Sequence, residues 1–561
     1  MLASEKTAKG HQLAWRHGTL TAADPLSAWQ GLLRARGLTE QDSFFSPRLA
    51  DLPDPFAMQD MERAATRMVA AIQAKQFIHV FGDFDADGVN GTAVLVEALR
   101  AAGATVSFSI PHRAEDGHGV GLEALRRVVA ESNCRIGLSV DTGTSCFAAC
   151  DEAKRLGFDL IITDHHLPEA TLPSAYALLN PARLDCGFAD RQLCGTGVAF
   201  FLLMAIWKKL TEQGKRPSYD LRTLLDRVAV ATVADVMELV GVNRVLVAHG
   251  LQRLNSAPSV GMAALMKVAR CTKRVTAETI GFHLAPRINA AGRMQHGEAA
   301  MQLLSCIDPD EADLLAEELD FTNKERRKVE AEVFKQAEEK LGDGAVLAVF
   351  DERWHAGVVG LAAGRLARKH GKPAAVGFIT PDGAIRLSLR GMKGFHIGHL
   401  LQRCRDHLEG FGGHAGAGGG TVKNGQWDAF FNTFADAVTE QSTNASDHTI
   451  QQIDGVLEAA ALHIGLADRL TRFEPFGRGN LPPLWLLKGM HIADRRDLKG
   501  GVVRLKLTDG HYWIDGIVFG GGAISTAIEP GLTVSLIGQL QKDDYRGGNA
   551  IQFVVDDVLP E

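Results

Sequence analysis

The chain has 561 residues, which is too long for one hydrophobic core and predicts three or four domains of about 150 residues each. A hydrophobic content of 46% is typical of globular proteins, and no stretch is long and uncharged enough to predict a membrane-spanning helix. The net charge of -7 excludes a globally positive protein, so a polyanionic ligand would have to be met by local basic patches or metal ions.

The cysteine pattern and the N-terminal residues indicate the cellular compartment. Eight cysteines are scattered along the chain without a Cys-x-x-Cys pair, so neither a zinc ribbon nor a disulfide framework is predicted. The first ten residues lack the apolar core of a secretory signal. We therefore expect a protein of the reducing cytoplasm with no membrane partner.

Residues 1–75 are predicted to form a helical lead-in, because apolar residues recur there at the spacing of one helix face. These residues are Trp29, Leu32, Leu33, Met61, Ala65, Met68 and Ala71. Residues 76–306 instead alternate short apolar runs with amphipathic helices, which predicts an α/β domain with a doubly wound parallel sheet. We expect its strands at residues 77–81, 105–110, 136–140 and 160–163.

The second half of the chain predicts a connecting helix and two further domains. Residues 307–342 are highly charged, with apolar residues at helical spacing, and predict one long helix. Residues 343–440 predict a second α/β domain, with strands near residues 346–350, 374–378 and 384–389. The polar residues 440–449 are the best linker candidate.

Residues 450–561 predict a small β-barrel, for which an OB-fold is the economical choice. Its expected strands lie at residues 502–507, 513–519, 532–540 and 550–555, separated by Asp-Gly or Gly-Gly turns. Aromatic and basic residues in this part suit stacking of bases and neutralisation of phosphates, although half of the aromatic rings could equally belong to the core. They are Tyr512, Trp513, Phe519, Tyr545, Arg504, Lys506, Lys542 and Arg546.

Acidic residues follow three of the predicted strands. Asp83, Asp141 and Asp164 each lie at the carboxyl end of a strand, which is the edge where open α/β sheets bind ligands. Asp85 and Asp87 extend the first group, and in an extended segment all three would project to one side. Carboxylates about 4 Å apart repel by roughly 4 kcal/mol at an effective dielectric near 20, so a divalent cation is the expected partner. The alternative is a turn of helix-capping aspartates.

The third acid begins the tripeptide Asp164-His165-His166, in which imidazole supplies a metal ligand and the carboxylate can orient the ring. A pair of histidines on a metal-free surface turn is the alternative interpretation. Asp235 ends an otherwise apolar helix, and a buried carboxylate there needs a partner such as the metal cluster. His79 has the spacing of a possible ligand, but we expect it to face the sheet.

Ten motifs in this order resemble the DHH phosphoesterase superfamily, and within it the RecJ family, from about residue 45 to the C-terminus. The first six are GDFDADG, SVDTG, TDHH, LNPAR, CGTGVAF and TVADVMEL, and the other four are HLAPRINAAGRM, WHAGVVGLAAGRLA, FGGHAGAGGG and FEPFGRGN. The resemblance implies a DHH-type catalytic domain, a DHHA1-type substrate-binding domain and a C-terminal OB-like barrel.

The resemblance also implies roles for individual residues. It implies two divalent ions, Mn²⁺ or Mg²⁺, bound by Asp83, Asp85, Asp141, His165 and Asp235. It makes His166 a contact of the scissile phosphate and Asp164 the residue that orients its neighbours, with Asp87 completing the catalytic set. The substrate phosphates would be held by Arg287, Asn289, Arg293, Ser388, Arg390, Gly412, Gly413 and His414. Tight glycine turns and helix-packing arginines are the structural alternatives for this last group.

The implied activity is single-stranded-DNA-specific 5' to 3' exonuclease action that releases 5' mononucleotides in DNA repair and recombination. Single-stranded DNA is then the substrate, with single-strand-binding protein and a RecQ-type helicase as implied partners. Two alternatives remain open. One is a DHH phosphodiesterase of oligoribonucleotides or cyclic dinucleotides, which has no evident use for the barrel, and the other is a structural replication subunit, which would not need intact acids.

Overall fold

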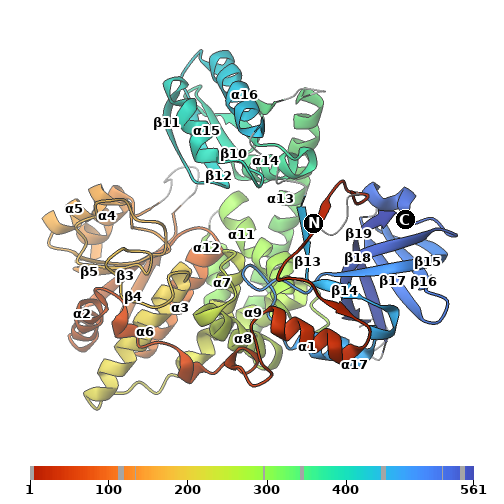
Figure 1. The fold of residues 1–561 in the computed structure, drawn as a ribbon. Helices are drawn as coiled ribbons and strands as arrows, with labels where there is room; N and C mark the ends of the chain where they lie inside the picture. Colours follow the sequence, from red (N-terminus) through yellow and green to blue (C-terminus); the bar gives the residue numbers. More distant parts are fainter. Residues whose placement is uncertain are drawn as a thin grey trace. The chain divides into compact units, whose positions relative to one another are not determined.

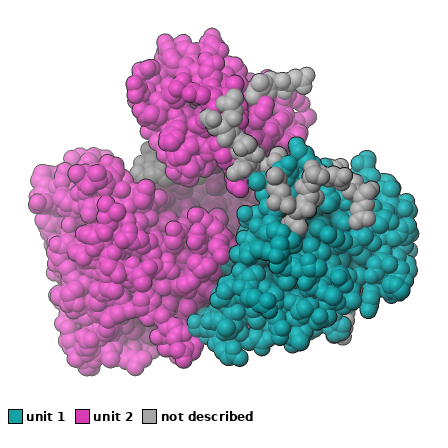
Figure 2. All heavy atoms as spheres, in the orientation of Figure 1, with its two compact units in different colours: residues 1–47, 446–476, 480–561 teal, residues 48–445, 477–479 magenta. Residues whose placement is uncertain are grey.

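The computed structural model describes residues 6–111, 119–132, 134–294, 297–341, 346–443, 450–520, 522–543 and 550–560. The chain forms two compact units (Figure 2). Unit 1 consists of residues 1–47, 446–476 and 480–561, and unit 2 consists of residues 48–445 and 477–479. Among the described residues, no helix combines the length and the apolar character needed to cross a membrane.

The first sheet of unit 2 is parallel and has five strands in the order β4-β3-β5-β6-β7, of which Figure 1 labels β3, β4 and β5. Its strands are β3 (Phe77–Phe81), β4 (Thr105–Ser109), β5 (Ile136–Val140), β6 (Asp159–Thr163) and β7 (Ala177–Leu179). Helices cover both faces and form two separate hydrophobic cores with it. These helices are α2 (Met61–Gln73), α3 (Ala86–Ala101) and α6 (Gly195–Glu212) on one face, and α4 (Leu122–Ser132) and α5 (Phe147–Arg155) on the other. The predicted doubly wound sheet is confirmed.

A helical layer extends this domain. It comprises α7 (Leu225–Ala234), α8 (Gly241–Ser256), α9 (Val260–Val268), α10 (Ala277–Thr279), the π-helix η5 (Ile280–Leu284), α11 (Ala285–Met294) and α12 (Glu298–Ser305). The long helix predicted over residues 307–342 is α13 (Pro309–Leu341), which packs on both α11 and α14 (Ala356–His370). This helix therefore joins the two α/β parts of unit 2.

The second sheet of unit 2 has the order β11-β12-β10-β9-β8. Its strands are β8 (Leu347–Asp351), β9 (Ala374–Ile379), β10 (Ile385–Arg390), β11 (Leu408–Gly413) and β12 (Ala417–Val422), and its other helices are α15 (Ile397–Arg403) and α16 (Trp427–Thr443). The glycine-rich segment forms the hairpin of β11 and β12, in which Gly412 pairs with Gly419 and Gly413 with Gly418. Its glycines therefore serve strand pairing at the edge of a sheet as well as any ligand.

Unit 1 contains the predicted barrel, which is confirmed with one strand more than expected. Strands β16, β17, β19, β18 and β15 follow one another in the sheet, and pairing of β16 with β15 closes it. The strands are β15 (Trp485–Leu498), β16 (Val502–Thr508), β17 (Trp513–Phe519), β18 (Thr533–Lys542) and β19 (Ile551–Pro560). Apolar side chains from all five strands fill the interior.

The first residues of the chain complete unit 1. β1 (Gln12–Trp15) pairs in parallel with β13 (Ile450–Ile453), β2 (Thr21–Ala22) pairs with β14 (Gly455–Leu457), and α1 (Pro25–Ala35) packs on α17 (Ile464–Thr471). Residues 1–75 were predicted as one helical lead-in, but its helical parts form two helices, α1 and α2, which belong to different units. The strands of this segment were not predicted from the sequence.

A buried carboxylate joins these early and late parts of unit 1. Asp454, between β13 and β14, is fully buried. Its Oδ2 accepts hydrogen bonds from Arg16 Nη1 at 2.6 Å and from the Leu484 amide at 2.9 Å, and its Oδ1 accepts one from Arg36 Nη2 at 3.4 Å. Two guanidinium groups and a backbone amide therefore compensate the charge that burial would otherwise make costly.

Candidate metal centre

The loop between β3 and α3, together with the first turn of α3, brings the first three aspartates to the sheet edge. Asp85 is the N-cap of α3, and its Oδ1 accepts hydrogen bonds from the amides of Asp87 and Gly88 at 2.9 and 3.1 Å. The helix therefore begins at Ala86, so the extended row predicted for the three acids is wrong for Asp87, which lies in the first helical turn. A Cβ at Gly88 would lie 2.6 Å from Cα of Asp83, so this close return of the chain requires glycine.

Asp87 points to the start of α6. Its two carboxylate oxygens accept hydrogen bonds from the amides of Gly195 and Thr196 at 2.7 and 2.9 Å. The positive end of a helix thus stabilises this buried anion. A Cβ at Gly195 would lie 2.6 Å from Cα of Asp141, so the motif containing Gly195 also closes the helix against the second acidic loop. No role for this motif was predicted from the sequence.

Asp141 follows β5 in a left-handed backbone conformation, with φ of 61°. Aspartate tolerates this region better than most residues, because its short side chain can bond locally. The Asp141 amide donates to the carbonyl of Thr163 at 2.9 Å, which fixes the turn to the end of β6. The side chain is buried and lies beside the histidines that follow that strand.

Asp164 organises the two histidines. Its Oδ1 accepts from the His165 amide at 2.8 Å and lies 2.7 Å from His166 Nδ1, while its Oδ2 accepts from the Thr144 amide at 2.8 Å. Burial disfavours the Asp164 carboxylate, but its bonds with His166 and Thr144 outweigh burial and hold its pKa below the usual value. The same hydrogen bond raises the pKa of His166 to about 9, so this imidazole is protonated at neutral pH. Asp164 thus takes the orienting position that the sequence predicted.

Asn180 also holds this loop, although no role beyond its motif was predicted for it. Its Nδ2 donates to the carbonyl of His166 at 2.8 Å and to Oγ1 of Thr144 at 3.0 Å, and its Oδ1 accepts from the Ala182 amide at 2.8 Å. The residue is completely buried just beyond β7. A polar residue directly after a strand was the available signal, but that strand was not predicted.

The predicted ligands converge in three overlapping groups. Within each group, one potential ligand atom per residue lies within 4.8 Å of the others. The groups are Asp83, Asp85 and Asp141; Asp87, His165 and Asp235; and Asp141, Asp164, His165 and His166. Because neighbouring groups share Asp141 or His165, the arrangement suits two adjacent ions. His165 lies centrally, with Nε2 at 3.1 Å from Asp141 Oδ1, 3.5 Å from Asp235 Oδ2 and 3.9 Å from Asp87 Oδ2.

The electrostatics of the cluster fit divalent cations. Oδ1 of Asp141 and Oδ2 of Asp235 are buried and accept no hydrogen bond from the described residues. Burial, reinforced by neighbouring carboxylates such as Asp87, raises the pKa of Asp141 well above its usual value and that of Asp235 to about 8. Burial also lowers the pKa of His165, so its imidazole is neutral and keeps a lone pair. Oxygen ligands with one imidazole suit Mn²⁺ or Mg²⁺.

His79 is separate from this cluster, as predicted. Its Nδ1 and Nε2 lie 2.7 and 2.9 Å from the hydroxyl oxygens of Ser107 and Ser109 on β4. Burial lowers the pKa of His79 to about 4, which keeps it neutral. His79 therefore links β3 to the neighbouring strand β4.

The three residues expected to clamp the substrate end lie on α11 in different environments. Asn289 Oδ1 accepts from the Ala86 amide at 2.8 Å, which ties α11 to the first acidic loop. Arg287 is paired with Asp320 of α13, with Nη2 to Oδ1 at 2.8 Å, as in the helix-packing alternative. Arg293 Nη1 donates to the Gly357 carbonyl of α14 at 3.3 Å. Arg287 and Arg293 thus join α11 to α13 and α14, and Asn289 joins it to the loop of the metal cluster.

The remaining candidate phosphate contacts lie on the second sheet. Arg390 Nη1 donates to Ser388 Oγ at 3.2 Å, and both side chains face Gly360 of α14, where a Cβ would lie 2.8 Å from Ser388 Oγ. His414 is exposed at the tip of the hairpin formed by β11 and β12, beside Gly412 and Gly413. Strand β12 lies between β10 and β11, so one sheet carries all of these residues.

Comparisons with known proteins agree with this geometry. Family models match in three places: the DHH family, N-terminal domain, at residues 77–232; the DHHA1 domain at residues 342–440; and the RecJ OB domain at residues 453–557. The chain is 33% identical over 566 residues to the single-stranded-DNA-specific exonuclease RecJ of Dickeya dadantii, covering 96% of this chain and 97% of that protein.

Solved structures give the same result. The crystal structure of RecJ from Thermus thermophilus in complex with Mn²⁺ superimposes with a TM-score of 0.79 at 27% identity, covering 98% of this chain and 80% of that one. The complex of the same protein with Mg²⁺ gives a TM-score of 0.74 at 25% identity, covering 98% and 79%. Both ions considered for the acidic cluster therefore occur in a similar protein.

Proposed function

The chain belongs to the RecJ family of single-stranded-DNA-specific exonucleases, and we propose that it removes mononucleotides one after another from the 5' end of a strand. It is a metal-dependent hydrolase of the DHH superfamily. The observation that carries the proposed mechanism is the convergence of Asp83, Asp85, Asp141, His165 and Asp235, which come from separate segments, within one cluster.

We assign the metal-binding role to these five residues and the orienting roles to their neighbours. When bound, two divalent ions supply an activated water and offset the charge that builds on the phosphorus and on the leaving 3' oxygen. Asp87 stays on the start of α6 and keeps the cluster close to that helix. Asn180 and Asp164 hold the histidine loop in place.

His166 is proposed to contact the scissile phosphate. Its ring is tied to Asp164 through Nδ1, which leaves Nε2 as the outward donor. The hydrogen bond to Asp164 raises its pKa and so favours the charged imidazole, and a charged donor binds a phosphate oxygen more strongly than a neutral one. More than half of its side chain is exposed, so a ligand can reach it.

The wider assignments follow from this site. We propose residues 76–306 as the DHH catalytic domain, residues 343–440 as the DHHA1 domain that holds the substrate, and residues 450–561 as the OB domain that grips the strand. The clamp roles of Arg287, Asn289, Arg293, Ser388, Arg390 and His414 remain part of the proposal. Single-strand-binding protein and a RecQ-type helicase are proposed partners, and the eight free cysteines support action in the cytoplasm.

Polarity and metal dependence can be tested together. Single-stranded DNA labelled at the 5' or the 3' end is incubated with Mn²⁺, with Mg²⁺ or with a chelator, beside duplex and RNA controls. We expect the 5' label to appear at once as a mononucleotide and the 3' label to shorten gradually, with no reaction after chelation. Immediate release of the 3' label as a mononucleotide would reverse the proposed polarity, and cleavage of cyclic dinucleotides or RNA at a similar rate would widen the substrate class.

The barrel gives a second prediction. Trp513 and Phe519 occupy the same face of β17 and are 64% and 63% exposed, whereas Arg504 and Lys506 on β16 both pair with Asp515. Base stacking contributes about 1–3 kcal/mol per base. We therefore expect Trp513→Ala with Phe519→Ala to weaken binding of long single strands measurably without changing kcat on a short oligonucleotide.

Other barrel residues supply the control for that experiment. Lys542 pairs with Asp468 of α17, so it serves packing within unit 1, and Tyr545 and Arg546 lie outside the described residues. A Lys542→Ala variant should affect stability more than affinity. Unchanged affinity of the double aromatic variant for long strands would show that this face does not stack bases.

A further inference from the structure

The tripeptide Gly477-Arg478-Gly479 is packed against the segment that follows Asp235. The Leu239 amide donates to the Arg478 carbonyl at 2.7 Å. Both flanking residues have little room for a side chain, because a Cβ would lie 2.7 Å from Leu239 Cδ1 at Gly477 and 3.1 Å from Glu238 Cβ at Gly479. Gly479 also has φ of 75°, a conformation that favours glycine. No role for this motif was predicted from the sequence.

The segment that receives the tripeptide is itself constrained. α7 ends at Ala234, Asp235 is its C-cap, and Val236 has the left-handed φ of 56°, which is unusual for a β-branched residue. The turn is held by hydrogen bonds from the Val236 and Met237 amides to carbonyls of α7. The backbone of the tripeptide therefore braces the segment immediately after a proposed metal ligand, and it does so without the Arg478 side chain.

The guanidinium of Arg478 has no comparable structural task. Its side chain is 56% exposed, and among the described residues it makes one ion pair, from Nε to Glu238 Oε1 at 3.5 Å. A guanidinium carries five N–H donors, and this ion pair involves only the one on Nε. The contacts of Arg478 with Glu238 and Leu239, three and four residues after Asp235, place it close in the fold to that proposed ligand.

We propose that Arg478 is a substrate-binding residue that contacts a backbone phosphate of the single strand next to the metal cluster. The inference rests on the exonuclease function proposed above. A guanidinium beside the bound ions adds positive charge that attracts a polyanion, and the planar fork of arginine matches phosphate oxygens. A segment distant from the catalytic domain in sequence thus supplies a contact to its substrate.

Salt dependence separates this role from a structural one. Each phosphate contact to a single strand contributes about -0.7 to the slope of log affinity against log salt concentration. We expect Arg478→Ala to weaken binding of a short 5'-phosphorylated oligonucleotide by about 10-fold and to reduce the slope by about 0.7, whereas Arg478→Lys keeps the slope. Binding is measured by anisotropy with the full chain in Ca²⁺, after confirming that no nucleotide is released.

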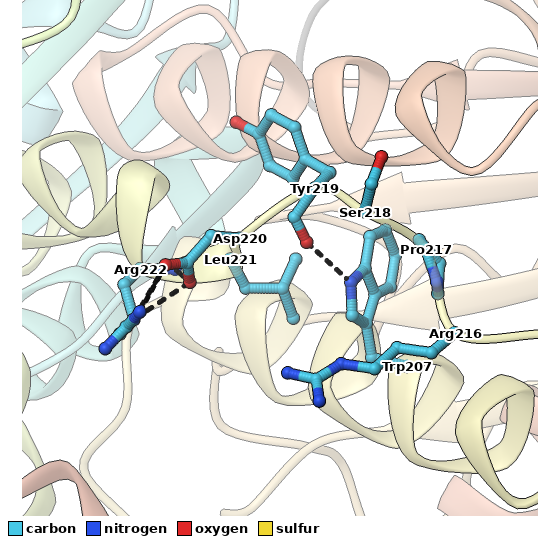
Figure 3. A pocket seen from close by; sticks show the side chains of 8 residues that line it. All are labelled: Trp207, Arg216, Pro217, Ser218, Tyr219, Asp220, Leu221 and Arg222. Carbon is cyan, nitrogen blue, oxygen red and sulfur yellow. Dashed lines mark hydrogen bonds and ion pairs between the residues drawn. The ribbon is translucent and has the colours of Figure 1, made fainter.

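Two control variants sharpen the comparison. Arg216 is an exposed arginine of unit 2 that lines a hollow of about 760 Å³ with Trp207 and Tyr219 (Figure 3). It follows the far end of α6, a helix roughly 27 Å long whose other end holds Asp87, so Arg216→Ala should leave the slope unchanged. Gly479→Ala should disturb the packing of the tripeptide against the segment after Asp235. We expect it to lower both kcat and the stabilisation of the protein by Mn²⁺.

Replacing single phosphates by neutral groups identifies the phosphate that Arg478 contacts. Oligonucleotides with one methylphosphonate at successive positions should show one position near the 5' end where the parental protein loses affinity and Arg478→Ala loses nothing further. Equal losses in both proteins at every position, or an unchanged salt slope in Arg478→Ala, would refute the proposal while the parental exonuclease activity stands. A parental protein that does not degrade single strands would instead refute the proposed function.

Discussion

His165→Ala is expected to lower kcat for single-strand degradation by more than about 100-fold while the protein remains folded. The imidazole lies at the centre of the cluster, with Nε2 3.1 Å from Asp141 and 3.5 Å from Asp235. Loss of residues that only orient metal ligands typically costs 10–100-fold, so loss of a ligand should cost more than about 100-fold. The measurement is initial rates on a labelled single strand in Mn²⁺, with Asp83→Ala expected to behave in the same way.

His79→Ala is the matched control for this prediction. His79 is also a buried histidine of the first domain, but it bonds to Ser107 and Ser109 instead of the cluster. This variant should lose stability and keep its rate per folded molecule. Stabilisation by Mn²⁺ in a melting experiment should persist in His79→Ala and weaken in His165→Ala, because only the folded site binds the ion. Parental rates in His165→Ala would remove that residue from the mechanism.

Asp454→Ala is expected to destabilise unit 1 by about 3–5 kcal/mol, the usual cost of removing one partner of a buried ion pair. The substitution leaves Arg16 and Arg36, which are largely buried, without the carboxylate that accepts from both. It also removes the acceptor for the Leu484 amide. Denaturant unfolding followed by tryptophan fluorescence reports on unit 1 through Trp29 and Trp485, which are completely buried there.

An exposed ion pair of the same unit provides the comparison. Asp494 and Arg496 lie 3.1 Å apart on the surface of β15, and such pairs contribute about 0–1 kcal/mol. Asp494→Ala should therefore leave the transition nearly unchanged. Stabilisation of unit 2 by Mn²⁺ should be retained in Asp454→Ala, since the acidic cluster belongs to the other unit. Equal stability of the two variants would contradict the assigned role of Asp454.

Local sequence patterns were sufficient wherever an element is buried on both sides or carries its own periodicity. The strands predicted at residues 77–81 and 136–140 are confirmed because unbroken apolar runs have one economical structure in an α/β domain. The helix predicted at residues 307–342 is confirmed as α13, because its apolar residues recur at the spacing of a helix. The aspartates that follow these strands were predicted to lie close together, and this prediction is confirmed. The reason is that parallel strands have their carboxyl ends at the same edge of the sheet.

Long-range partners could not be predicted in this way. Nothing local indicates that Asp87 bonds to the amides of α6 or that Arg287 pairs with Asp320. The glycine run suggested a phosphate loop, but its strand pairing depends on β10 and on α15, which lie elsewhere in the sequence. Short strands such as β1 and β2 have too few residues to show alternation, so only their partners define them.

The pairing of β1 with β13 has a consequence for synthesis of the protein. Gln12 pairs with Ile450, so the first strand leaves the ribosome long before its partner is made. At roughly 5–20 residues per second, this strand waits on the order of 20 to 90 seconds. The catalytic unit, almost all of which lies between these strands in sequence, can fold during that interval. Slower translation should therefore lengthen the exposure of this unpaired strand edge to chaperones and to aggregation.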